Sequence, residues 1–159
     1  MVIVAATASA TQQLEAVYRQ EGDRLWRALI AFGGDPDLAS DAVAEAFAQA
    51  LRRGSGINDL PAWVWRAAFR IAAGELKRRP LTSDRIPDRG YLPPTADLDL
   101  LDALAQLPDK QRAAVILFYY ADAPVREIAR RTGMSQISVR ANLSRGRKRL
   151  KELLGDTDA

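Results

Sequence analysis

Two residue types that carry much of protein chemistry are missing, because the 159-residue sequence contains neither cysteine nor histidine. Disulfides, thiolate or imidazole metal ligands, and catalysis by cysteine or histidine are therefore excluded. A glycine-rich phosphate-binding loop is also absent, and no apolar run approaches the ~20 residues that cross a bilayer. We therefore expect no enzymatic activity, no cofactor, no metal and no membrane insertion. The lack of cysteine fits a cytoplasmic location.

The N-terminal segment Met1–Ala10 is apolar, but no lysine or arginine precedes it and its apolar part is short. We interpret it as a flexible arm rather than a signal peptide.

Positive charge is unevenly distributed along the chain. The segment Val125–Leu154 contains nine lysines and arginines and two acidic residues, whereas the rest of the chain contains 14 basic and 18 acidic residues. The net charge of +3 therefore hides a basic C-terminal end and a slightly acidic remainder. Such an end favours a polyanionic partner.

Apolar spacing predicts an all-α fold of two small helical domains, and alternation of the strand type is absent. Four prolines within residues 80–96 predict a flexible, Pro-rich linker between the halves, which divides the chain into residues 12–79, 80–97 and 98–154. The expected helices cover residues 14–32, 35–53, 59–79, 98–107, 108–121, 125–132 and 135–154.

The basic C-terminal end has the pattern of a helix-turn-helix. Val125–Arg131 provides a short first helix, Thr132–Met134 provides a turn that contains a glycine, and Ser135 is placed to cap the next helix. In that second helix an apolar stripe recurs at spacings of four and three residues, which predicts one buried face: Val139, Leu143, Gly146, Leu150 and Leu153.

The opposite face of this helix carries small residues, with Arg140 and Arg145 beside them. Small residues let a helix approach base edges closely, and arginines reach guanine edges or phosphates. The alternative is a solvated basic helix in a small bundle. An outward Ile137 argues against that alternative, because a thymine methyl or a partner explains an exposed isoleucine better, although it could also tuck against the turn.

Six motifs in this half resemble, in order and spacing, the C-terminal domain of bacterial sigma factors, which contacts the −35 promoter element. The match is to the small two-domain class, the extracytoplasmic-function (ECF, group IV) sigma factors. The motifs are LAQLPDKQR (104–112), ILFYY (116–120), EIA (127–129), GMS (133–135), SVR (138–140) and LSRGR (143–147). The resemblance and the outward face together predict −35 DNA contacts at Arg126, Arg130, Ser135, Gln136, Ile137, Ser138, Arg140, Ala141, Ser144, Arg145 and Lys148.

The N-terminal half supports the same resemblance. Residues 35–53 are similar to the family helix that docks on the β′ clamp helices of RNA polymerase, with Asp41, Glu45 and Phe47 at matching positions. Residues 62–79 resemble the helix that captures the −10 element as a single strand. The implied polymerase contacts are Leu38, Asp41, Glu45, Gln49 and Arg52. The implied −10 contacts are Asn58, Asp59, Trp65, Arg66, Arg70, Lys77, Arg78 and Arg79.

Each of these N-terminal features also has a structural interpretation. Unstacked bases bind to aromatic and arginine side chains along a basic groove, but an aromatic residue on a helix is more often part of the core. We expect Trp63 and Phe69 to be core residues and leave Trp65 open. The acidic residues of 35–53 could form a solvated face, and the cations at 77–79 could simply complement a helix C-terminus.

The chain departs from the family pattern at several positions. The family commonly has glutamine where this chain has Ala44. It commonly has an Arg-Asn pair where this chain has Phe69 and Arg70, and an aspartate where this chain has Gly74.

The sequence therefore predicts a transcription initiation factor that binds core RNA polymerase, at the β′ clamp helices and the β flap, and directs it to promoter DNA. An anti-sigma factor is a further partner that the resemblance implies. One alternative is a polymerase-independent helix-turn-helix transcriptional regulator whose first half serves to dimerise. The aromatic and basic segment 62–79 separates the two, because an operator-binding protein does not need it. A sigma-like fold retained as an interaction protein is a third interpretation.

Overall fold

The first helix is longer than the sequence predicts. The computed structural model describes residues 2–78 and 98–155, with the side chains of residues 9–78 and 99–155, and α1 spans Val2–Gly33. The expectation of a flexible arm is therefore wrong. The arm contains four alanines and neither proline nor glycine, so no residue in it breaks a helix. The helix ends where the amide of Gly34, at φ 72°, donates to the carbonyl of Ile30 at 2.7 Å.

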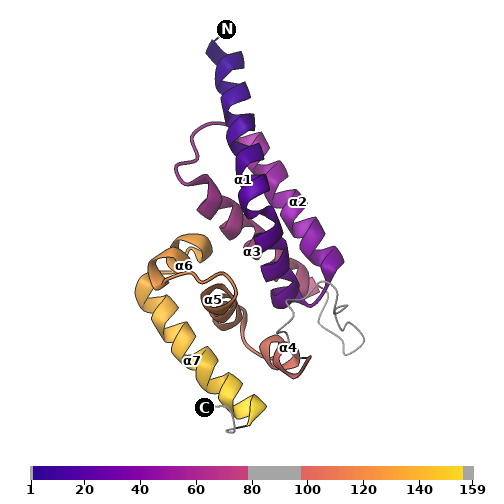
Figure 1. Ribbon diagram of the computed structural model, residues 1–159, viewed down its shortest axis with the longest axis vertical. Helices are drawn as coiled ribbons and strands as arrows, with labels where there is room; N and C mark the ends of the chain where they lie inside the picture. Colours follow the sequence, from indigo (N-terminus) through magenta and orange to yellow (C-terminus); the bar gives the residue numbers. More distant parts are fainter. Residues whose placement is uncertain (1, 79–97, 156–159) are drawn as a thin grey trace.

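Two capped helices complete the N-terminal half. In α2 (Pro36–Arg53), proline occupies the first turn and the Asp35 carboxylate accepts from the amide of Asp37 at 2.9 Å. In α3 (Leu60–Arg78), the Asp59 carboxylate accepts from the amide of Ala62 at 3.2 Å. Both boundaries lie within one residue of the prediction. The three helices pack side by side as a bundle (Figure 1).

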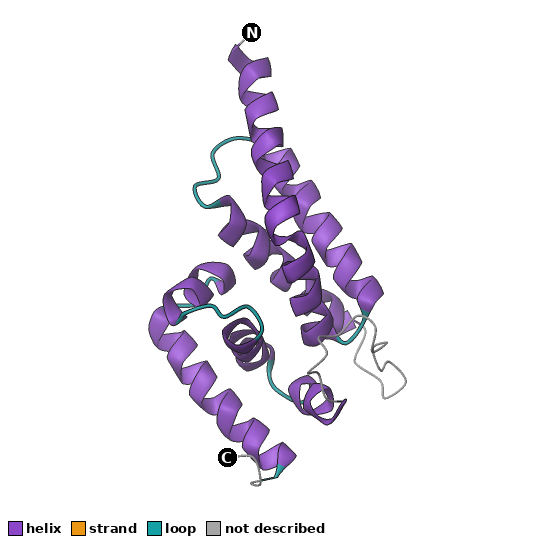
Figure 2. Cartoon of the chain, viewed as in Figure 1, coloured by secondary structure: helices purple, strands orange, loops and turns teal. Residues whose placement is uncertain are grey.

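Four helices form the C-terminal half: α4 (Leu98–Ala105), α5 (Asp109–Tyr119), α6 (Val125–Thr132) and α7 (Gln136–Leu154). The long helix α7 lies against α5, and Gly146 permits a close approach there. A Cβ at Gly146 would lie 2.7 Å from Cγ2 of Val115. All the regular structure in residues 2–78 and 98–155 is helical, as expected for an all-α chain (Figure 2).

The two halves pack against one another. Helix α6 lies on α3, and α4 and α5 lie near the C-terminal end of α1 (Figure 1). A single hydrophobic core runs through both halves and joins residues such as Leu29 and Val64 to Ile116 and Ile128. The predicted linker, residues 80–97, lies outside the described residues, as does Arg79. Within the described residues, no helix is long and apolar enough to cross a membrane.

One buried arginine joins the halves at the base of the bundle. The Arg112 Nη1 atom donates to the carbonyl of Phe32 at 2.7 Å, and Nη2 donates to the carbonyl of Leu107 at 2.9 Å. Phe32 is in the last turn of α1, whose carbonyls have no partner within the helix. A cation at that position also complements the helix dipole. Burial lowers the pKa of Arg112, and the nearby Asp109 carboxylate opposes that shift.

Candidate nucleic-acid interface

The face of α7 that the sequence predicts to contact duplex DNA is exposed to solvent, and we call it the reading face. The Ile137 side chain is 79% exposed and does not tuck against the turn. Arg140, Ser144, Arg145 and Lys148 are exposed beside it, whereas Val139, Leu143 and Gly146 are buried on the other side. The other residues predicted to contact the −35 element are exposed or half-buried: Arg126, Arg130, Ser135, Gln136, Ser138 and Ala141.

Local hydrogen bonds hold α7 in place relative to α6. Gly133 adopts a left-handed φ of 80°, which strongly favours glycine. The Thr132 hydroxyl donates to a carbonyl one turn back in α6 at 2.7 Å and accepts from the amide of Met134 at 3.2 Å. Ser135 caps α7 as predicted, accepting from the amide of Ser138 at 3.1 Å. The reading helix is therefore fixed at its N-terminal end, where groove contacts begin.

Not every cation of the basic segment Val125–Leu154 is available on the surface. Arg131 is buried, at 8% exposure. Arg147 donates from Nε to the Tyr119 hydroxyl at 2.8 Å, and its guanidinium carbon lies 4.7 Å from the centroid of the Phe118 ring. Arg131 therefore serves packing, whereas Arg147 stays exposed while its guanidinium contacts the two rings of α5. A usable sequence signal existed for Arg131, because it follows the buried Ile128 by three residues and so shares its face.

An acidic surface lies on α2. Asp41, Ala44 and Glu45 are exposed there. The Oε1 atom of Glu45 accepts from Gln49 Nε2 at 3.1 Å and from Arg52 Nη2 at 3.0 Å. These two hydrogen bonds lower the pKa of Glu45, with that from Gln49 the larger cause. The bonded carboxylate is therefore held in its charged form.

Leu38, one of the residues predicted to contact the polymerase, is 1% exposed because it packs into the core of the bundle. It is also part of the lining of a groove on this side of α2. This groove, of about 560 Å³, lies between α2 and α3, next to the acidic surface. Its lining includes Asp41, Glu45, Ile71 and Glu75, so it combines carboxylates with an apolar wall.

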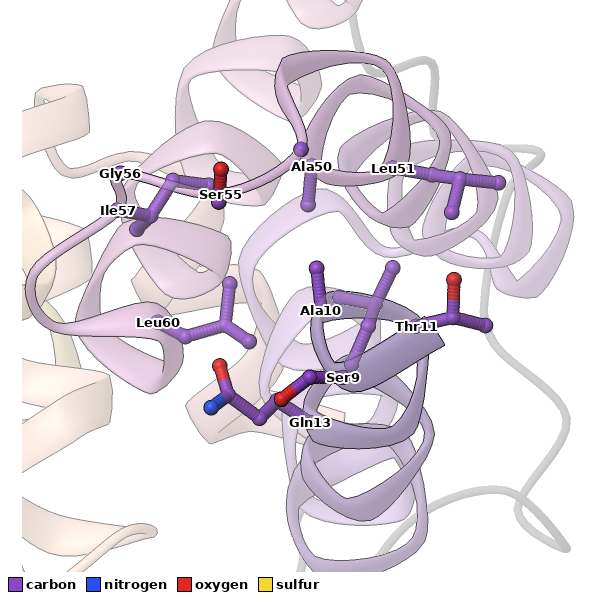
Figure 3. A pocket seen from close by; sticks show the side chains of 12 residues that line it. Ser9, Ala10, Thr11, Gln13, Ala50, Leu51, Ser55, Gly56, Ile57 and Leu60 are labelled. Carbon is purple, nitrogen blue, oxygen red and sulfur yellow. The ribbon is translucent and has the colours of Figure 1, made fainter. Parts of the chain in front are cut away.

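The loop before α3 borders a pocket of about 430 Å³ (Figure 3). Ser55, Gly56 and Ile57 line one side, and α1 contributes Ser9 and Gln13 on the other. Of the predicted −10 residues, Asn58 in this loop and Arg66, Arg70, Lys77 and Arg78 on α3 are exposed. Arg70 donates to Gln49 Oε1 at 3.4 Å, and Arg78 pairs with Glu75 at 2.9 Å.

Trp65 is fully buried, unlike the other described members of the predicted −10 set. Its side chain is 0% exposed, and the guanidinium carbon of Arg131 lies 4.5 Å from its ring centroid. An unstacked base therefore cannot reach this ring in the present arrangement. Phe69 is buried as expected, and Trp63 is only half-buried.

In the described residues all regular structure is helical, and α6 and α7 form a C-terminal helix-turn-helix, an element typical of DNA-binding proteins. The family model described as Sigma-70, region 4 matches residues 97–150. The chain is 30% identical over 156 residues to the RNA polymerase sigma-E factor of Streptomyces antibioticus, covering 92% of this chain and 87% of the relative. It is 28% identical to the ECF RNA polymerase sigma factor SigL of Mycobacterium tuberculosis, covering 87% and 86% of the two chains.

It is also 26% identical to the ECF sigma factor SigE of Mycolicibacterium smegmatis, but it spans only 61% of that relative. The fold is shared with two solved structures. CnrH, in complex with the cytosolic domain of CnrY, gives a TM-score of 0.73 at 21% identity, covering 98% of this chain and 97% of that one. The sigma factor RpoE, in complex with the anti-sigma factor NepR from Bartonella quintana, gives a TM-score of 0.65 at 23% identity. That match covers 94% of this chain and 98% of RpoE.

The chain belongs to the ECF class of RNA polymerase sigma factors, which act in transcription initiation.

Proposed function

We propose that this sigma factor docks on core RNA polymerase through α2 and directs it to promoters by reading a −35 element as duplex and a −10 element as single strand. The observation that carries the proposal is the exposed face of α7, where an isoleucine that is 79% exposed lies one turn before the exposed Arg140 on a capped helix. Major-groove readout needs this combination of an apolar contact for thymine methyls and cations for guanines and phosphates.

The polymerase contacts of the proposal rest on α2. Asp41 and Glu45 give one exposed face of this helix a negative charge, and the groove beside them adds an apolar wall. A helical partner with basic and apolar residues, such as the clamp helices of the β′ subunit, has the complementary chemistry. The proposed contacts are Asp41, Glu45, Gln49 and Arg52, together with Leu38 in the lining of the groove. We extend the proposal to the β flap as a partner of the C-terminal half.

The single-strand contacts of the proposal rest on Asn58 and Asp59 in the loop and on the cations of α3. Exposed cations follow one another along α3, an arrangement that suits contacts to successive phosphates of a single strand: Arg66, Arg70, Lys77 and Arg78.

Two further statements are proposals of the same kind. Residues 12–79 and 98–154 act as the −10 and −35 modules, and the protein works in the cytoplasm without enzymatic activity. An anti-sigma factor as partner is proposed because the sigma factor RpoE, which shares this fold, was solved in complex with the anti-sigma factor NepR.

Co-elution of the full chain with core RNA polymerase on size exclusion tests this proposal. We expect co-elution of the parent and its loss in the Asp41→Arg/Glu45→Arg double variant. The matched control is Asp102→Arg/Glu152→Arg, which makes the same charge change at exposed positions of α4 and α7. Duplex DNA binding without co-elution of the parent would instead support the operator-binding regulator.

A further inference from the structure

Three aromatic rings of the N-terminal half lie in a row between two arginines of the C-terminal half. We call this row, Trp65, Phe69 and Phe32, the aromatic stack. Trp65 and Phe69 are stacked at 6.2 Å between centroids, and Phe69 meets Phe32 edge-on at 5.1 Å. Arg131 lies over the free face of Trp65 at 4.5 Å, and Arg112 lies over Phe32 at 4.9 Å. These arginines are the two buried charged residues among the described residues.

The two arginines are satisfied to very different degrees. Arg112 donates from both terminal nitrogens to carbonyls, and its Nε is its one nitrogen buried without a hydrogen-bond partner. Arg131 lies 3.3 Å from the Glu127 carboxylate through Nε, without the geometry of a hydrogen bond, and its Nη1 is buried with no partner. The indole nitrogen of Trp65 is also buried without a partner. Because unpaired buried donors regain hydrogen bonds when they reach water, the Arg131 end is the weaker of the two.

Helix α6 brings more than Arg131 onto α3. Arg130 pairs with Asp59 at 3.5 Å, and a Cβ at Gly133 would lie 3.4 Å from Cδ of Arg66. A groove of about 430 Å³ remains between α3 and the turn, lined by Trp63, Arg66, Arg70 and Gly133 among others. A DNA backbone can therefore reach the arginines of α3, but a base cannot reach the face of Trp65.

We propose that α6 is an intramolecular cover of α3, and that single-strand capture requires its release from Trp65, whose free face Arg131 occupies in place of a base. Arginine and nucleobases use the same aromatic face, since cation–π contact and base stacking both need it. The inference rests on the proposed function for its DNA step. The acidic surface of α2 and the reading face of α7 stay exposed in the covered form, so polymerase docking and duplex binding can precede release.

The fluorescence of Trp65 can report release of α6, because the sequence has only three tryptophans and the other two can be replaced. In a full-length Trp26→Phe/Trp63→Phe chain, Trp65 emission in the covered form is blue-shifted and poorly quenched by acrylamide. We expect Arg131→Ala to shift the emission to the red and increase quenching. The matched control is Lys110→Ala, which removes one charge at an exposed position of α5. Equal, low quenching in both variants would overturn the proposal.

Binding of a short, fluorescein-labelled, random-sequence single-stranded DNA completes the test, measured by anisotropy with the full chain, free and on core polymerase. The apparent affinity is the intrinsic affinity multiplied by the uncovered fraction, so if about nine in ten molecules are covered, Arg131→Ala is expected to tighten binding about tenfold. Lys110→Ala should leave it unchanged. If Arg131→Ala exposes Trp65 but leaves the affinity for single-stranded DNA unchanged, the proposal that α6 covers α3 is refuted, while the proposed function is not. Absence of single-strand binding in every variant would refute the −10 reading of the proposed function, and the inference with it.

A second measurement keeps the test decisive if the single-tryptophan chain does not fold. The chain has no native cysteine, so Gln20→Cys and Lys151→Cys, at exposed positions of α1 and α7, can be labelled without background for energy transfer. Transfer is expected to be high in the free protein, lower in Arg131→Ala, and lower in the parent when single-stranded DNA binds. Transfer that is insensitive to both changes would overturn the proposal.

Discussion

Replacing Arg112 by alanine tests the contact that joins the two halves at the base of the bundle. The change removes two short hydrogen bonds to the carbonyls of Phe32 and Leu107. Bonds from a charged donor contribute about 1.5–3 kcal/mol each, and the stacking on Phe32 adds about 0.5–2 kcal/mol. Relief of the buried charge offsets part of this loss. We expect the free energy of unfolding to fall by about 3–5 kcal/mol.

Urea denaturation followed by far-ultraviolet circular dichroism measures this change. Arg112→Lys keeps the charge but cannot donate from two terminal nitrogens in the same fork, so it should lie between the parent and alanine. Lys110→Ala, on the same helix and exposed, should change stability by less than about 0.5 kcal/mol. A loss below about 1 kcal/mol for Arg112→Ala would refute the view that this arginine joins the halves.

Two further predictions concern α7 and α3. Arg140→Ala and Arg145→Ala should each weaken promoter-duplex binding, and each should reduce the slope of log affinity against log salt by about 0.9 if the arginine contacts a phosphate. Unchanged affinity and slope in both variants would contradict the proposed reading face. Gly146→Ala should destabilise the fold by about 1–3 kcal/mol, because its Cβ would lie 2.7 Å from Val115. Gly74→Ala, a helix glycine with nothing within 4 Å of an added Cβ, should instead stabilise by up to about 1 kcal/mol; equal Tm shifts for the two glycines would refute this reasoning.

Local rules predicted most of the elements. Caps and breakers are short-range signals, so Asp35, Asp59 and Ser135 marked helix starts that the structure confirms. Periodicity placed Ile137 outside and Val139 inside, because one helix turn is enough to assign a face. The N-terminal extension of α1 was missed because an apolar, uncapped segment without charge periodicity gives no boundary signal.

Contacts between the halves were beyond the reach of the same rules. Trp65 could be core or exposed from its own helix, and its burial depends on Arg131, 66 positions later. Such outcomes are set by which helices pack together, and neither propensity nor spacing within one helix contains that information.

Alanine occupies many of the buried positions of the N-terminal bundle, and Ala39, Ala46, Ala68 and Ala72 are each fully enclosed. These positions cannot lose much to truncation, because little side chain is left to remove. They can be overfilled, since each added methylene must displace close-packed neighbours. Sequence drift in the bundle is therefore constrained mainly by size, and a substitution to serine or glycine should be accepted more readily there than one to valine or leucine.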